Sequence, residues 1–148
     1  MSPPADVQQI ARAMRGECLA MRVRQLNRRV TRVYDAALRP LGVSTAQLNV
    51  LVALALMSEA RATDVATALG LEKSTLSRNL ERMMARGWVA GGAGGGGAQP
   101  LRLLPAGRRL LADALPAWRA AQRRVAAELP PELVDALRRG GPGPAATP

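Results

Sequence analysis

The sequence predicts a mainly α-helical protein of the α+β class, with one small β-hairpin. Apolar residues recur every three or four positions over long stretches, which is the spacing of amphipathic helices. Aromatic residues are scarce, with no Phe, one Tyr and two Trp, so the core must be built from Leu, Val, Ala and Met. Such a core favours packed helices over a β-sandwich. The 148 residues suffice for one compact domain with appended helices.

The first long helix is predicted for residues 14–38, after an irregular N-terminal arm at residues 1–13. The alternative for this arm is a turn into helix near Val7. Its apolar residues step by four and three positions along one stripe, and its arginines lie largely off that stripe. We therefore treat residues 14–41 as the first structural unit. Ser44 is a good N-cap for a second helix, which runs to about Met57.

Residues 63–86 have the spacing of a helix-turn-helix. Thr63 is predicted to cap a short helix, and Gly70 allows the tight turn that follows it. The small Ala66 lets two helices cross closely, and Leu76 returns to the core. A DNA-binding motif of this kind is the firmest local feature of the sequence.

The second helix of this pair separates an apolar face from a polar and basic one. At about 100° per residue, Thr75, Arg78 and Asn79 point away from the core. Arginine can pair with guanine edges or phosphates, and asparagine with adenine. The alternative is a solvated amphipathic helix in a bundle. The predicted DNA contacts are Lys73, Ser74, Thr75, Ser77, Arg78, Asn79, Arg82 and, from the hairpin, Arg102.

The net charge of the chain also favours binding to nucleic acid. The net charge is +10, and Lys73 is the only lysine. A strong basic excess on a small domain suggests a polyanionic partner, of which double-stranded DNA is the first candidate.

Two short apolar runs flank the Gly-rich residues 91–97 and predict a β-hairpin. The alternative is a disordered linker between two domains. With the hairpin included, residues 42–104 form the predicted winged helix-turn-helix lobe.

The C-terminal third is predicted to be helical. Pro105 takes the favoured first-turn position of a long helix, which Pro116 should bend. A short last helix follows at residues 132–139. Residues 105–139 thus form the C-terminal helical unit, and residues 140–148 form a disordered tail of Gly, Pro and Ala.

In its motifs the chain resembles the multiple-antibiotic-resistance regulator (MarR) family of winged helix-turn-helix regulators. Each matching piece is weak alone, and together they are specific. They lie, in the order of the family, between residues 17 and 127. The pieces are residues 34–48 (YDAALRPLGVSTAQL), 71–78 (LEKSTLSR), 84–89 (MARGWV) and 104–111 (LPAGRRLL).

The resemblance implies a homodimer whose platform is formed by the first, fifth and sixth predicted helices. It also implies that the fourth helix enters the major groove of each half of a pseudo-palindromic operator, as in a repressor. The hairpin departs from the family pattern, because no charged residue precedes Arg102 within it. This departure leaves a second hypothesis from another class, a dimeric helical adaptor that has lost operator binding.

The resemblance implies two ways in which repression could be relieved. Family members bind small, often phenolic, anionic effectors, and we place such a ligand near Arg22, Tyr34 and Trp118. Peroxide-sensing members hold a reactive cysteine in the neighbourhood of Cys18. The alternative for Cys18 is a small buried hydrophobic residue at the dimer interface.

Several classes of protein are disfavoured. The chain has no histidine and one cysteine, so His-based catalytic triads, His-based zinc sites and intramolecular disulfides are excluded. No apolar stretch is long enough for a membrane span, and no export signal opens the chain. We expect a cytoplasmic protein that is not an enzyme and has no cofactor or metal.

Overall fold

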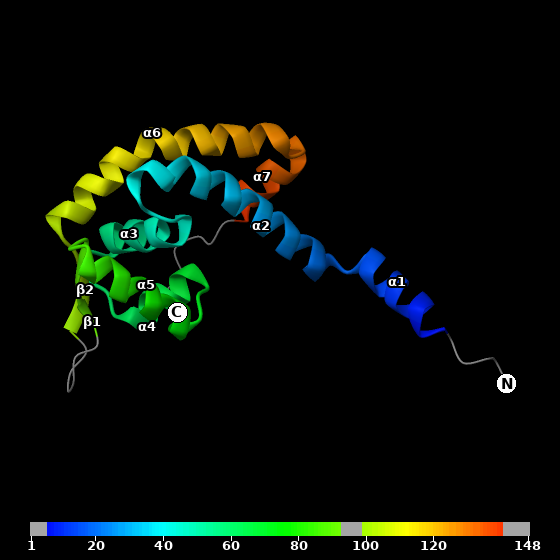
Figure 1. The fold of residues 1–148 in the computed structure, drawn as a ribbon, viewed down its shortest axis with the longest axis horizontal. Coiled ribbons are helices and arrows are strands. Elements are labelled where there is room, and N and C mark those ends of the chain that lie inside the picture. Colours follow the sequence, from blue (N-terminus) through cyan, green and yellow to red (C-terminus); the bar gives the residue numbers. More distant parts are fainter. Residues whose placement is uncertain (1–5, 93–98, 141–148) are drawn as a thin grey trace.

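The computed structural model describes residues 6–92 and 99–140, which form helices and one hairpin (Figure 1). The helices are α1 (Val7–Glu17), α2 (Leu19–Leu38), η1 (Arg39–Leu41, a 3₁₀ turn), α3 (Thr45–Met57), α4 (Ala62–Leu69), α5 (Lys73–Ala85), α6 (Pro105–Glu128) and α7 (Pro131–Arg139). The strands are β1 (Val89–Gly92) and β2 (Gln99–Leu103). The mainly helical class with one small antiparallel sheet is confirmed.

The molecule has two parts. We call α2, α6 and α7 the platform, and residues 42–104, with α3 to α5 and the hairpin, the lobe. In Figure 1, α6 curves over the top of the molecule, and the lobe lies on the other side of α2. The core sits in the lobe and is closed by the end of α2 and the first turns of α6, because its buried residues run from Leu38 to Ala114.

Contacts between α2 and α6 hold the platform together. Arg29 on α2 forms an ion pair with Glu128 on α6, with 3.3 Å between Nη2 and Oε2. Arg124 reaches the other oxygen of Glu128 at 3.0 Å. The hydrogen bonds from Arg124 and Arg29 lower the pKa of Glu128. The α6 helix runs through Pro116 without a break and is curved.

The start of α3 confirms the predicted cap. The Ser44 hydroxyl accepts from the Gln47 N–H at 3.2 Å, and the Gln47 side chain accepts from the Ser44 N–H at 3.1 Å. Asp35 at the end of α2 accepts from both the backbone and the hydroxyl of Thr45, at 2.8 and 2.6 Å. This carboxylate fastens the platform to the start of the lobe, where a negative charge suits a helix N-terminus.

The predicted hairpin is confirmed. Val89 pairs with Leu103 and Ala90 with Arg102, and a bulge follows. Gly91 in the bulge has a φ of +96°, and a Cβ there would lie 2.1 Å from the Pro100 carbonyl oxygen, so only glycine fits. The rest of the Gly-rich stretch, residues 93–98, lies outside the described residues.

The predicted N-terminal boundaries were wrong. Residues 7–17 form α1 where an irregular arm was expected, because the Asp6 carboxylate accepts from the Gln8 N–H at 3.0 Å and caps a helix there. The long helix predicted from residue 14 is also interrupted. Cys18 has extended backbone angles, φ −70° and ψ 104°, and separates α1 from α2.

A smaller difference concerns the start of α4. Helix α4 begins at Ala62, not after Thr63, because the Asp64 carboxylate accepts from the Arg61 N–H at 3.3 Å. Most of the predicted C-terminal tail, residues 141–148, lies outside the described residues.

Among the described residues, no single helix is long and apolar enough to cross a membrane. One bent pair, Leu19–Leu41 with Thr45–Met57, meets the criteria of length and composition alone, as the buried core helix of a folded domain can.

Candidate nucleic-acid interface

The turn between α4 and α5 has the geometry expected of a helix-turn-helix. Gly70 adopts a φ of +61°, in the left-handed region that favours glycine. The Gly70 N–H donates to the Thr67 carbonyl at 3.2 Å, and the Leu71 N–H donates to the Ala66 carbonyl at 2.9 Å. These bonds satisfy the end of α4 and redirect the chain into α5.

Helix α5 is anchored by its inner face. Leu76, Leu80 and Met83 are buried, with Leu76 only 2% exposed. Burial of three such side chains contributes roughly 1.5–3 kcal/mol each, which holds the helix against the lobe. The opposite face is therefore free to meet a ligand.

The outer face of α5 carries the predicted contact residues. Thr75 and Asn79 are half-buried, and the Asn79 amide donates to the Thr75 carbonyl at 3.2 Å. The Nε of Arg78 donates to the Ser74 carbonyl at 3.3 Å. Arg102 projects from β2, between the buried Leu101 and Leu103. The exposed members of the predicted set are Lys73, Ser74, Ser77, Arg78, Arg82 and Arg102.

Arg86, which the sequence reasoning did not single out, closes the C-terminal end of α5. Its Nη1 donates to the Gly42 carbonyl at 2.8 Å, and its guanidinium carbon lies 5.0 Å from the centre of the Trp88 ring. Because Gly42 is 44 residues away in the chain, no local sequence pattern predicts this contact.

We compared the sequence and the structure with those of known proteins. The family model described as MarR family matches residues 41–97. The chain is 32% identical to the Mycobacterium tuberculosis transcriptional regulator MosR, with a TM-score of 0.72, over 84% of this chain and 93% of that chain. The protein belongs to the MarR family.

Other solved structures show the same fold. MosR in complex with DNA is 34% identical, with a TM-score of 0.70, over 84% of this chain and 95% of that one. A cysteine-to-serine mutant of Escherichia coli MarR complexed with operator DNA is 18% identical, with a TM-score of 0.71, over 85% and 92% of the two chains. A comparison with curated protein sequences gave no match. As a MarR-family member, the chain is a transcriptional regulator rather than an enzyme.

The residues predicted to hold an effector do not all meet in this MarR-family chain. The Tyr34 hydroxyl donates to the Gln122 side chain on α6, and burial raises the pKa of the phenol. Trp118 lies one turn before Gln122 and is 37% exposed. Arg22 lies twelve residues before Tyr34, roughly 18 Å along α2, and its guanidinium donates to the Gly16 carbonyl. Within one chain Arg22 thus lies apart from Tyr34, and an effector site that includes all three residues stays a prediction.

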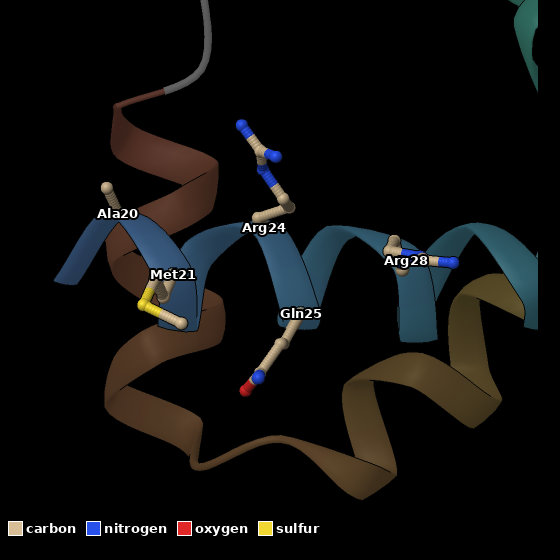
Figure 2. A pocket seen from close by; sticks show the side chains of 5 residues that line it. All are labelled: Ala20, Met21, Arg24, Gln25 and Arg28. Carbon is tan, nitrogen blue, oxygen red and sulfur yellow. The ribbon is translucent and has the colours of Figure 1, made fainter. Parts of the chain in front are cut away.

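A different hollow lies on α2. It has a volume of about 370 Å³ and is shown in Figure 2. Its lining within the described residues is Ala20, Met21, Arg24, Gln25 and Arg28. None of the predicted effector residues belongs to it, and all five side chains come from one helix. The hollow is thus an open groove along the helix surface.

Cys18 lies at the junction of α1 and α2. Its thiol is free and half-buried, and its N–H donates to the Met14 carbonyl at 3.0 Å. A chemical change of this side chain would act where α1 turns into α2.

Proposed function

We propose that this MarR-family regulator binds double-stranded DNA with α5 in the major groove. The observation that carries the proposal is the outer face of α5, where Arg78 and Arg82 are exposed one turn apart, opposite a buried apolar face. Arginine reads guanine, and the half-buried Asn79 is suited to adenine. The small hydroxyl of Ser74 and the backbone N–H groups at the start of α5 suit a phosphate. Arg102 on β2 adds a positive charge beside the helix.

We further propose that the protein acts as a homodimer. Apolar side chains on α1 and the first half of α2 are exposed, with Val7 at 77% and Leu19 at 75% exposure. Leu137 on α7 is also exposed. Exposed apolar side chains on these helices favour burial against a partner. Two copies related by a two-fold axis would present two α5 helices to a pseudo-palindromic site.

The proposed mode of action is repression. Two recognition helices bound across a promoter would exclude the transcription machinery. A small phenolic or anionic ligand, or oxidation, would then shift the dimer toward a state in which the helices no longer match the half-sites.

The first test measures binding to the promoter region upstream of the protein's own gene. We expect affinity that falls steeply with salt, because phosphate contacts release counterions. Arg78→Ala should weaken binding by at least about tenfold, since one base or phosphate contact is lost in each protomer. Arg119→Ala, which removes an exposed arginine from α6, is the matched control and should bind like the wild type.

A wild-type protein that dimerises but shows no salt-dependent binding would favour the adaptor hypothesis instead. The sequence feature behind that hypothesis is the hairpin, which carries no charged residue before Arg102.

The second test asks whether oxidation of Cys18 releases the protein from DNA. A hydroperoxide would transfer one oxygen to the Cys18 thiolate and leave as the alcohol, which yields a sulfenic acid at the α1–α2 junction. We expect cumene hydroperoxide to release DNA from the wild type and not from Cys18→Ser, as measured by fluorescence anisotropy. Equal release from both proteins would rule out Cys18 as a sensor. Release by salicylate alone would assign relief to a small anionic ligand.

A further inference from the structure

Arg86 lies where the end of α5, the turn at Gly42 and the Trp88 side chain meet. It is the residue that follows α5, and its guanidinium lies between the Gly42 carbonyl and the Trp88 ring. A guanidinium can donate in its plane and stack with its face at the same time, which an ammonium cannot do. The side chain thus holds two neighbours at once.

Both neighbours of Arg86 lie at the joints between the platform and the lobe. Gly42 ends η1, the turn that follows the platform helix α2, and its N–H donates to the Arg39 carbonyl at 3.0 Å. The Trp88 carbonyl accepts from the Leu104 N–H at 2.9 Å, directly before α6. A Cβ on Gly107, in the first turn of α6, would lie 2.4 Å from that same carbonyl oxygen. Arg86 therefore connects the end of α5 to both joints with the platform.

Within residues 6–92 and 99–140, no side-chain hydrogen bond of α5 itself reaches beyond the helix. The bonds of Arg78 and Asn79 both end on carbonyls of α5 itself. The turn at Gly70 places the N-terminal end of α5, and the buried inner face holds the helix against the lobe. At the C-terminal end, Arg86 adds a side-chain link to Gly42. Two fixed ends set the direction of a helix.

Because α5 is long, a small change in its direction moves its far end by a large distance. Its 13 residues span about 20 Å. A tilt of about 5° around one end would move the other end by roughly 2 Å, which is enough to break a hydrogen bond to a base edge. Small changes at the Arg86 end are thereby amplified at the groove.

We propose that Arg86 is a positioning residue, which ties the C-terminal end of α5 to the platform joints and so sets the angle at which α5 meets DNA. This inference rests on the proposed DNA-binding function. Arg86 acts through the residues of α5 and does not itself read the DNA.

The experiment compares Arg86→Gln with Arg39→Gln. Arg39 is exposed, lies three residues before Gly42 and makes no side-chain hydrogen bond within the described residues, so its variant removes the same charge from the same region. Binding to the promoter fragment is measured across a salt series, at a temperature where circular dichroism shows each variant folded. We expect Arg86→Gln to lose about tenfold in affinity with an unchanged slope of log K against log salt. Arg39→Gln should lose little.

Two further variants separate positioning from a phosphate contact. Arg86→Lys keeps the charge but cannot stack and donate together, so it should restore less than half of the lost binding free energy. Gly42→Ala places a Cβ 2.8 Å from the Arg86 Nη1 and should reproduce the loss if it folds. Full rescue by lysine, or a slope reduced by about one in Arg86→Gln, would assign Arg86 to a phosphate and overturn the inference.

Different results would overturn the positioning role of Arg86 and the proposed DNA-binding function. If the wild type binds DNA and Arg86→Gln binds equally well, only the positioning role is lost. If the wild type does not bind DNA in any salt, both are lost.

Discussion

Ser58 is the one non-glycine residue with a positive φ in the described part of the chain. Its φ is 62° and its ψ is −57°, and the Glu59 N–H donates to the Met57 carbonyl at 2.7 Å. This is a γ-turn of the strained kind. It ends α3 and directs the chain to Ala60, which pairs with Leu101 of the hairpin. A single strained residue therefore joins the helical part of the lobe to its sheet.

We predict that Ser58→Gly stabilises the protein by about 0.5–1 kcal/mol. Glycine avoids a cost of roughly 1–2 kcal/mol for an L-residue in the left-handed region, and part of that gain is offset by its greater freedom in the unfolded chain. Urea denaturation would measure the change. Ser58→Ala, which keeps a Cβ, should be nearly neutral, and a destabilised Ser58→Gly would contradict the assigned strain.

At the scale of elements, local signals predicted most of the fold. The cap at Ser44, the turn at Gly70 and the hairpin all depend on residues close together in sequence, and all are confirmed. The break at Cys18 was missed, because no proline lies between Met14 and Leu19 to mark it. The carbonyl of Gly16, next to the break, instead accepts from the Arg22 side chain. A side-chain contact of this kind leaves no trace in an apolar pattern.

For the candidate interface, the sequence predicted which side chains of α5 are buried and which are exposed. The helical wheel separated Leu76 and Leu80 from Arg78 correctly, because 100° steps hold in any α-helix. Ser77 is exposed as well. Arg86 was not predicted at all, since its partner is distant in sequence.

For the whole molecule, the proposed dimer is the main expectation. The apolar stripe of α2 that packs on α6 continues past it to Val23 and Leu19, which are 65% and 75% exposed in the single chain. Such a stripe costs solvation free energy unless a second copy covers it.

We predict that light scattering after size exclusion shows a dimer for the wild type and a monomer for Leu19→Asp/Val23→Asp, because two charges would be buried unpaired in the interface. Leu56→Asp is the control. Leu56 is 82% exposed near the C-terminal end of α3, outside the stripe of α2, and its variant should stay dimeric. A dimeric double variant would place the interface elsewhere.

The sequence by itself determined the helix-turn-helix, the outward face of α5 and the family, because caps, turns and helical periodicity are properties of neighbouring residues. Only the tertiary structure decided how α5 is held. The Arg86 side chain donates to the carbonyl of Gly42, 44 residues away in the chain, and Ala60 pairs with Leu101 of the hairpin. Such pairs form when packed elements bring distant backbone groups within hydrogen-bond reach, and no local pattern encodes that distance.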